Sequence, residues 1–135
     1  MKLAGFNFTK YNIEKKSNDY KDLKVSSGIN IESIEEAKSN FLKTKEILLA
    51  VNWKFNVNYE PKIASIELGG NLVIGLDSKK AKEILKKWSK KEIDEEFNVK
   101  VLNVILKKCN IKALQFEDDF SLPIHFKLPS LKAKQ

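Results

Sequence analysis

The sequence predicts an α+β fold: a four-stranded antiparallel sheet, then two helices packed on one face of it, then an extended proline-containing C-terminal tail. Two observations lead to this prediction. Apolar residues alternate with a period of two as far as residue 76, and from Asp77 they recur with the helical period of 3.6. Pro123 and Pro129 lie near the C-terminus, where proline disfavours a helix because it cannot donate a backbone hydrogen bond.

Length and composition bound the class of protein. The 135 residues, 42% hydrophobic and 32% charged, fit a single globular domain over 1–135. Cys109 is the only cysteine, which excludes a disulfide framework and indicates a reducing cytoplasm. No apolar run approaches the roughly 18 residues that a membrane span needs. We therefore expect a cytoplasmic domain without a membrane span.

The first two strands are expected near 3–13 and 23–33, separated by a polar loop. In the first, the alternation shifts after Phe8, which indicates a bulge or an edge position near Thr9 and Lys10. In the second, the apolar residues share one parity.

The third and fourth strands, near 46–60 and 63–76, give the clearest pattern. In the third, every odd-numbered residue from 47 is apolar and the even-numbered residues of its second half are polar, as in an antiparallel strand with one buried face. The turn at 60–62 joins the two strands into a long hairpin. Gly69-Gly70 interrupts the fourth strand and indicates a bulge or a close backbone approach.

Two helices follow. The first is predicted near 78–91, with Asp77 as its cap, one apolar stripe and a mostly lysine outer face. The second is predicted near 94–116, beginning at Asp94, with a longer apolar stripe that includes Cys109.

No residues form a recognisable catalytic or metal site. Nucleophilic catalysis needs a hydroxyl or thiol beside a base, whereas Cys109 lies on an apolar helix stripe and the only histidine, His125, lies in the tail. One histidine and one cysteine cannot complete a zinc shell, and Gly69-Gly70 lacks the lysine and the following helix of a phosphate loop. We therefore expect no cofactor, no metal and no enzyme activity.

The charge of the chain leaves an alternative open. The net charge is +7, all 25 basic residues are lysine, and residues 79–112 hold eleven lysines against five acids. Such a face suits either plain solvation or nucleic-acid binding, although arginine is the better ligand for phosphate. The lysines of the alternative reading are Lys79, Lys80, Lys86, Lys87 and Lys90. An aromatic platform for bases at Trp53 and Phe55 is disfavoured, because both share the parity of the buried face.

The order of parts resembles the SecB family of export chaperones. The strand Ile66-Glu-Leu-Gly-Gly-Asn-Leu-Val-Ile74 is similar to the family's strand with a glycine pair. The stretch from Val101 to Leu131 resembles the family's last segment, in which a helix leads into an apolar, proline-containing tail. The resemblance implies a dimer of dimers that holds unfolded polypeptides in apolar grooves. Relatives that couple to the SecA motor carry acidic surface, whereas this chain is basic, so we expect a general holdase or an altered partner in place of delivery to that motor.

We therefore expect a homo-oligomer, dimer or tetramer, that binds unfolded polypeptide clients. The sheet itself supports an oligomer, because the helices cover one face and Leu48 and Ala50 interrupt the polar parity on the other. The residues expected to bind a client are Phe116, at the helix side of a groove, and the apolar tail residues that core packing does not explain: Phe120, Leu122, Ile124, Phe126 and Leu128. The alternative is that this tail only seals the core or a subunit interface.

Overall fold

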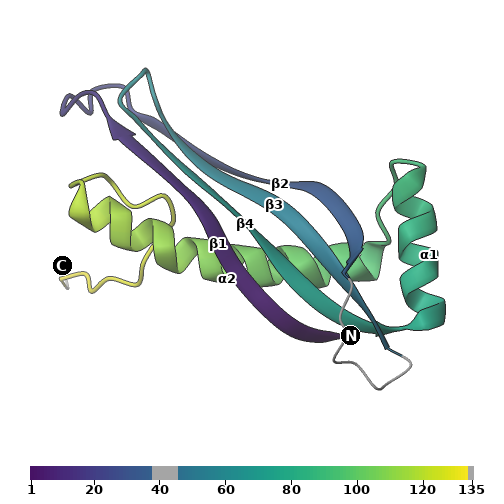
Figure 1. The fold of residues 1–135 in the computed structure, drawn as a ribbon. Coiled ribbons are helices and arrows are strands. Elements are labelled where there is room, and N and C mark those ends of the chain that lie inside the picture. The colour runs from purple at the N-terminus through teal and green to yellow at the C-terminus, as the bar shows by residue number, and fades with distance from the viewer. Residues whose placement is uncertain (38–45, 134–135) are drawn as a thin grey trace.

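The computed structural model describes residues 1–37 and 46–133. The elements are, in chain order, β1 (Lys2–Lys15), β2 (Lys24–Ala37), β3 (Glu46–Glu60), β4 (Ala64–Asp77), α1 (Ser78–Ser89) and α2 (Glu95–Asp119). The strands form one antiparallel sheet in the order β1-β4-β3-β2, followed by the helices and an extended tail (Figure 1). This confirms the predicted fold class. No helix in the described part of the chain is long and apolar enough to cross a membrane.

Several boundaries differ from the predicted ones. β1 continues to Lys15 because this polar end pairs with Ala64 of β4, and backbone pairing does not depend on side-chain polarity. β2 likewise continues to Ala37 through pairing with β3. α1 ends at Ser89, before the predicted residue 91, because Lys90 caps it and Lys91 has a φ of 61°. α2 runs on past residue 116 to Asp119.

The glycine pair of β4 faces the predicted irregularity of β1. The register shifts between Phe8 and Lys10, which pair with Gly70 and Gly69. A Cβ atom on Gly70 would lie 2.1 Å from the carbonyl oxygen of Asn7 and 2.7 Å from Cζ2 of Trp53. Both expectations, a bulge and a close backbone approach, are therefore confirmed at one place.

The connection between β1 and β2 crosses the end of the β3–β4 hairpin. The backbone N–H groups of Lys16 and Ser17 donate to the carbonyl oxygen of Ile63, at 2.8 and 3.3 Å. This crossing carries the chain from one edge of the sheet to the other, which is why β1 and β2 become the two edge strands.

The core lies between the sheet and α2. Alternate residues of β3 and β4 point into it, including Trp53, Phe55 and Tyr59, all about 1% exposed. α2 runs along the back of the sheet in Figure 1, whereas α1 stands at one end. Every fourth residue of α2 is fully buried against the sheet, and these are Phe97, Val101, Ile105, Cys109 and Ala113. α1 contributes Ala81 and Ile84.

The other face of the sheet is open and mainly polar. Four side chains of alternating charge cross it: the ammonium of Lys10 lies 3.1 Å from Glu67, and that of Lys54 lies 3.9 Å from Glu67 and 3.2 Å from Glu32. Towards one end, the half-buried Leu48 and Ala50 break this polarity, as the sequence predicts.

Candidate functional site

The tail and the last turns of α2 form an apolar groove with a volume of about 560 Å³. α2 is closed by Phe120, and Ser121 adopts a φ of 54°, which turns the chain back along the helix. The N–H of Leu122 then donates to the carbonyl of Glu117 at 2.8 Å. The residues that line the groove are Leu114, Gln115, Glu117, Asp118, Ser121, Leu122, Ile124 and Leu128.

The six residues predicted to bind a client divide into two sets. Leu122, Ile124 and Leu128 line the groove; Leu122 is only 6% exposed and also seals the core, whereas Ile124 and Leu128 are 41% and 40% exposed.

The three predicted phenylalanines are not among the residues that line the groove. Phe116 packs edge-on against Tyr11 of β1, with 5.1 Å between ring centroids. Phe126 packs against the imidazole of His125 at 4.8 Å. Phe120 stands at the end of α2 with 38% of its surface exposed.

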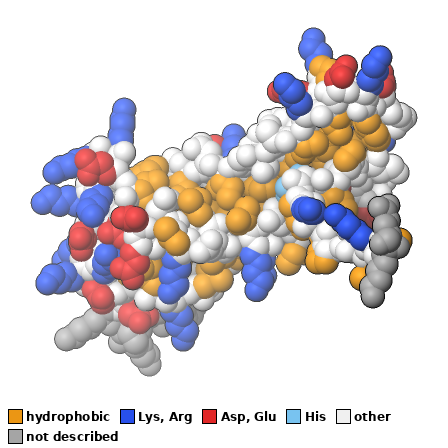
Figure 2. All heavy atoms as spheres, turned by 180° about the vertical axis from the view of Figure 1, so that it is seen from behind, with side chains coloured by type: hydrophobic (Ala, Val, Ile, Leu, Met, Phe, Trp, Pro, Cys, Tyr) orange, Lys and Arg blue, Asp and Glu red, His pale blue; other side chains and the backbone are white. Residues whose placement is uncertain are grey.

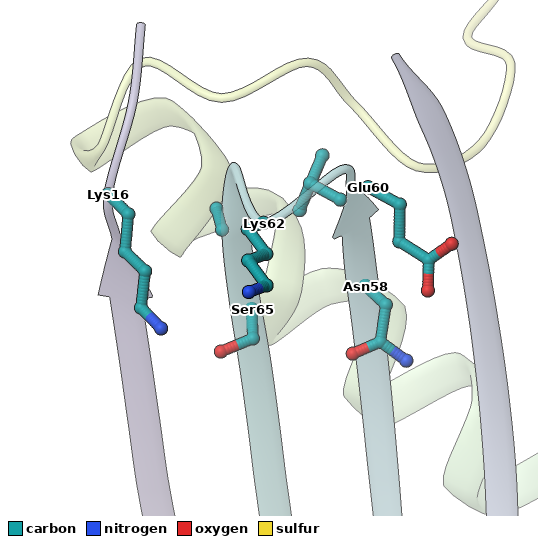
Figure 3. A pocket seen from close by; sticks show the side chains of 7 residues that line it. Lys16, Asn58, Glu60, Lys62 and Ser65 are labelled. Atoms are coloured by element: carbon teal, nitrogen blue, oxygen red, sulfur yellow. The ribbon is translucent and has the colours of Figure 1, made fainter.

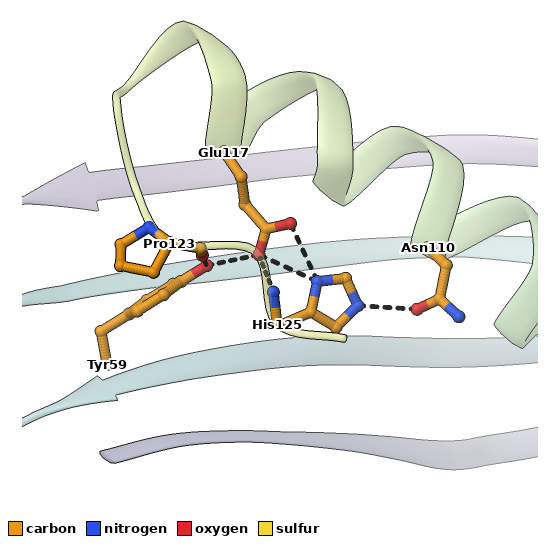
Figure 4. Close-up of polar contacts among 5 residues, drawn as sticks. All are labelled: Tyr59, Asn110, Glu117, Pro123 and His125. Atoms are coloured by element: carbon orange, nitrogen blue, oxygen red, sulfur yellow. Dashed lines mark hydrogen bonds and ion pairs between the residues drawn. The ribbon is translucent and has the colours of Figure 1, made fainter. Parts of the chain in front are cut away.

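A buried polar cluster holds the tail against α2 (Figure 4). The hydroxyl of Tyr59 hydrogen-bonds to Oε2 of Glu117 and lies 2.7 Å from the carbonyl oxygen of Pro123. The backbone N–H of His125 donates to Oε2 of Glu117 at 3.1 Å. The imidazole Nδ1 lies 2.8 and 2.9 Å from the two oxygens of Glu117, and Nε2 lies 2.7 Å from Oδ1 of Asn110.

Burial determines the chemistry of this cluster. The side chains of Glu117 and His125 are 0% and 3% exposed. Desolvation, together with the hydrogen bond to Glu117, raises the pKa of Tyr59, so its hydroxyl keeps its proton and acts as a donor.

Sequence reasoning missed this cluster, although one signal for it was present. The buried positions of α2 recur every four residues up to Ala113, and the next is Glu117. The predicted helix ends at residue 116, one residue before this position, whereas α2 continues to Asp119. The imidazole of His125, the only histidine, contacts Glu117. Burial raises the pKa of the Cys109 thiol to about 12, so the thiol is a core residue without thiolate character.

The start of the tail has a second attachment, to β1 and the loop that follows it. The ammonium of Lys15 donates to the carbonyl oxygen of Phe120 at 2.8 Å. The hydroxyl of Tyr20 donates to the carbonyl oxygen of Ser121 at 2.5 Å. The same ammonium lies 5.5 Å from the centre of the Tyr20 ring. The tail is thus fixed where it leaves α2 as well as at His125.

Two further hollows lie on the open face of the sheet near the hairpin end. One, of about 210 Å³, is bordered by Lys16, Asn58, Lys62 and Ser65 (Figure 3). The other, of about 470 Å³, shares Asn58 and Ser65 with it. Their mostly polar linings suit them poorly to apolar side chains. Within the residues that the structure describes, no three His, Cys, Asp or Glu side chains lie together as a metal site would require.

Part of the lysine face of α1 has a structural role. The ammonium groups of Lys80 and Lys87 lie 3.1 and 3.5 Å from Oδ1 of Asp94, the N-cap of α2. Of the five lysines in the nucleic-acid reading, these two join the helices, and Lys79, Lys86 and Lys90 are exposed.

Comparison with known proteins identifies the fold. No family model and no curated protein matches the chain. Among solved structures, the chain is similar to the Rv1957 SecB-like chaperone of Mycobacterium tuberculosis, solved in complex with a ChAD peptide from the Rv1956 HigA1 antitoxin. The likeness covers 99% of this chain and 92% of that one, with a TM-score of 0.51 and 4% sequence identity. The chain therefore has a SecB-like fold, which confirms the predicted resemblance at the level of the fold.

Proposed function

We propose that the protein is a cytoplasmic, non-catalytic holdase that binds unfolded or non-native polypeptides in the groove between α2 and the tail. The observation that carries the proposal is the pair Ile124 and Leu128, which line the groove yet keep about 40% of their surface exposed. Core packing does not account for two large aliphatic side chains at such a position. The similar fold of a chaperone solved with a bound peptide supports the same reading.

The form of the groove suits an extended apolar segment. Its volume, about 560 Å³, is sufficient for a few side chains. One wall is a helix and the other is a tail whose Pro123 restricts the backbone to extended conformations, so little entropy is lost when a client binds. Unfolded chains present apolar side chains at irregular spacing, which an open apolar groove accepts better than a polar, shape-specific pocket does.

Replacing groove residues tests this function. The double variant I124S/L128S should weaken binding of a fluorescent apolar peptide about tenfold or more, because two aliphatic contacts are lost. It should also lose suppression of aggregation of a chemically unfolded client protein. Leu131→Ser is the matched control, since Leu131 lies in the same tail and is fully exposed at 102%. Unchanged client holding in the double variant, or its unfolding, would contradict the groove.

We propose further that the protein is a homo-oligomer, a dimer or tetramer. Figure 2 shows hydrophobic side chains gathered in a band along the face on the α2 side. Three large apolar residues on α2 are exposed: Val99 (54%), Leu106 (41%) and Ile111 (53%). Val99 and Leu106 lie seven residues apart and so share one face of the helix, which suits contact with a second subunit.

Nucleic-acid binding is the second candidate, favoured by the exposed lysines Lys79, Lys86 and Lys90 on the outer side of α1. Salt separates the two functions. Binding to phosphate should fall steeply as salt is raised, whereas peptide binding should survive ~0.3 M salt, where surface charges are well screened. Measuring both ligands across one salt series assigns the function.

A further inference from the structure

The imidazole of His125 has an oxygen atom opposite each ring nitrogen (Figure 4). Nδ1 faces the carboxylate of Glu117 at 2.8 Å, and Nε2 faces the amide oxygen of Asn110 at 2.7 Å. Oxygen atoms of these groups accept hydrogen bonds, so both nitrogens donate only when the ring carries both protons. A ring that carries both protons would form an ion pair with Glu117 and donate to Asn110.

We propose that the tail is a releasable strap and that this charged pair is its clasp, so that groove formation depends on the charge of His125 and Glu117. The consequence for clients rests on the proposed holdase function. Asn110 and Glu117 lie seven residues apart, two turns of α2, and so share the face on which the ring sits. Ile124 precedes His125 and Leu128 follows it by three residues, and both line the groove.

The strap depends on few attachments. Among the described residues beyond Ser121, the hydrogen bonds of the tail to the rest of the protein involve Leu122, Pro123 and His125. The carbonyl of Pro123 contacts Tyr59, the backbone N–H and the imidazole of His125 contact Glu117, and Tyr59 and Glu117 hydrogen-bond to each other. Loss of one buried charge would therefore remove several of these contacts together, since a buried charge left without its partner is strongly unfavourable.

The charged and titratable groups around His125 give the direction of the response. α2 presents Glu117, with Asp118 at the groove; β3 presents Tyr59, which stays protonated. Lys15 and Tyr20 hold the start of the tail from the β1 side. Acid that protonates Glu117 leaves the imidazolium without its counter-charge, and base that removes a ring proton leaves a lone pair opposite an oxygen. The strap loosens in both directions.

Nitrogen NMR of the wild-type protein tests the charge state directly, because His125 is the only histidine in the chain. At neutral pH both ring nitrogens should show the chemical shifts of protonated nitrogen. An unprotonated ring nitrogen under these conditions would overturn the proposal. This measurement needs no variant and no ligand.

Hydrogen exchange of the free protein tests the strap. In Glu117→Gln, the amides of Leu122 and His125 should exchange at least about tenfold faster, while amides of β3 keep their protection. Asp119→Asn is the control, since it makes the same charge change two residues away at the exposed end of α2. Equal tail protection in Glu117→Gln and Asp119→Asn would refute the clasp.

If Glu117→Gln does not fold, the pH dependence of tail protection in the wild type decides, measured against β3 amides and corrected for intrinsic exchange. If the protection of the tail amides changes in parallel with that of the β3 amides at acid and alkaline pH, the strap is refuted. Peptide affinity is measured separately: it should fall about tenfold or more wherever the tail amides lose protection. A wild-type protein that shows the clasp but binds no peptide would refute the holdase function alone.

Discussion

The hydroxyl of Tyr59 lies between two acceptors in the buried cluster, the carboxylate of Glu117 and the carbonyl of Pro123, and has one proton to donate. Tyr59→Phe removes this donor without changing the shape of the ring. We expect the free energy of unfolding to fall by about 1–3 kcal/mol, because a buried acceptor loses its partner. Urea denaturation measures the change. Tyr11→Phe serves as control, since the Tyr11 side chain is 48% exposed, and an equal loss there would contradict the role of the cluster.

Gly70 offers a second test at the scale of one residue. An added Cβ would lie 2.1 Å from the carbonyl oxygen of Asn7, so β1 or the indole of Trp53 would have to move. Gly70→Ala should therefore lower the free energy of unfolding by about 2 kcal/mol or more. Gly5→Ala is the matched comparison in the same sheet, because nothing lies within 4 Å of its added Cβ, and it should be nearly neutral. Similar effects of the two changes in thermal unfolding would mean that the close approach is unimportant.

At the scale of elements, Asp94 fixes the start of α2 and its junction with α1. Its carboxylate accepts from the N–H of Phe97 at 3.0 Å and pairs with Lys80 and Lys87. Asp94→Ala removes cap and charge and should lower the free energy of unfolding by about 1–2 kcal/mol. Asp94→Asn keeps a good cap and loses only the charge, so its effect should be smaller. Denaturation of the three proteins at neutral pH checks this order, and an equal loss in both variants would contradict it.

The same residue predicts a pH dependence. The hydrogen bond from Phe97 and, after it, the ammonium of Lys80 hold the pKa of Asp94 below its usual value of 3.8. Because its pKa is lower in the folded protein, Asp94 adds stability at any pH above its pKa in the unfolded chain. This stability is lost as the pH falls through its pKa in the folded protein. The stability difference between wild type and Asp94→Asn should therefore shrink below about pH 4. If denaturation experiments show that the stability difference persists in acid, the charge of Asp94 is not the source of that difference.

The elements were largely predictable because their signals are local. The parity of β3 and the change of period at Asp77 each need only a short window of sequence, and Asp94 is recognisable as a cap. The strand order was not predictable, since β1 beside β4 depends on a connection that crosses the hairpin at Ile63. The clasp was missed for a related reason: Glu117 and His125 acquire their role only when the tail folds back over α2.

At the scale of the whole molecule, the two faces of the sheet differ. α2 covers one face, and the other is crossed by the exposed charges of Lys10, Glu67, Lys54 and Glu32. Such partly exposed pairs contribute little to stability, but they keep the open face hydrophilic. The outer side of α2, with the exposed Val99 and Leu106, is therefore the surface that we propose for a partner subunit (Figure 2).

Assembly through this outer side of α2 can be tested by introducing charge. Val99 and Leu106 lie seven residues apart, two helical turns, so they face the same way, and both are exposed in the single chain. Val99→Asp with Leu106→Asp would place two carboxylates in an apolar interface, where an unpaired charge is strongly unfavourable. We expect the wild type to sediment as a dimer or tetramer at micromolar concentration and this variant to sediment as a folded monomer. Leu131→Asp, in the exposed tail, should leave the assembly unchanged. A monomeric wild type would refute the oligomer, and an assembled double variant would place the interface elsewhere, with the half-buried Leu48 and Ala50 on the open face of the sheet as the next surface to change.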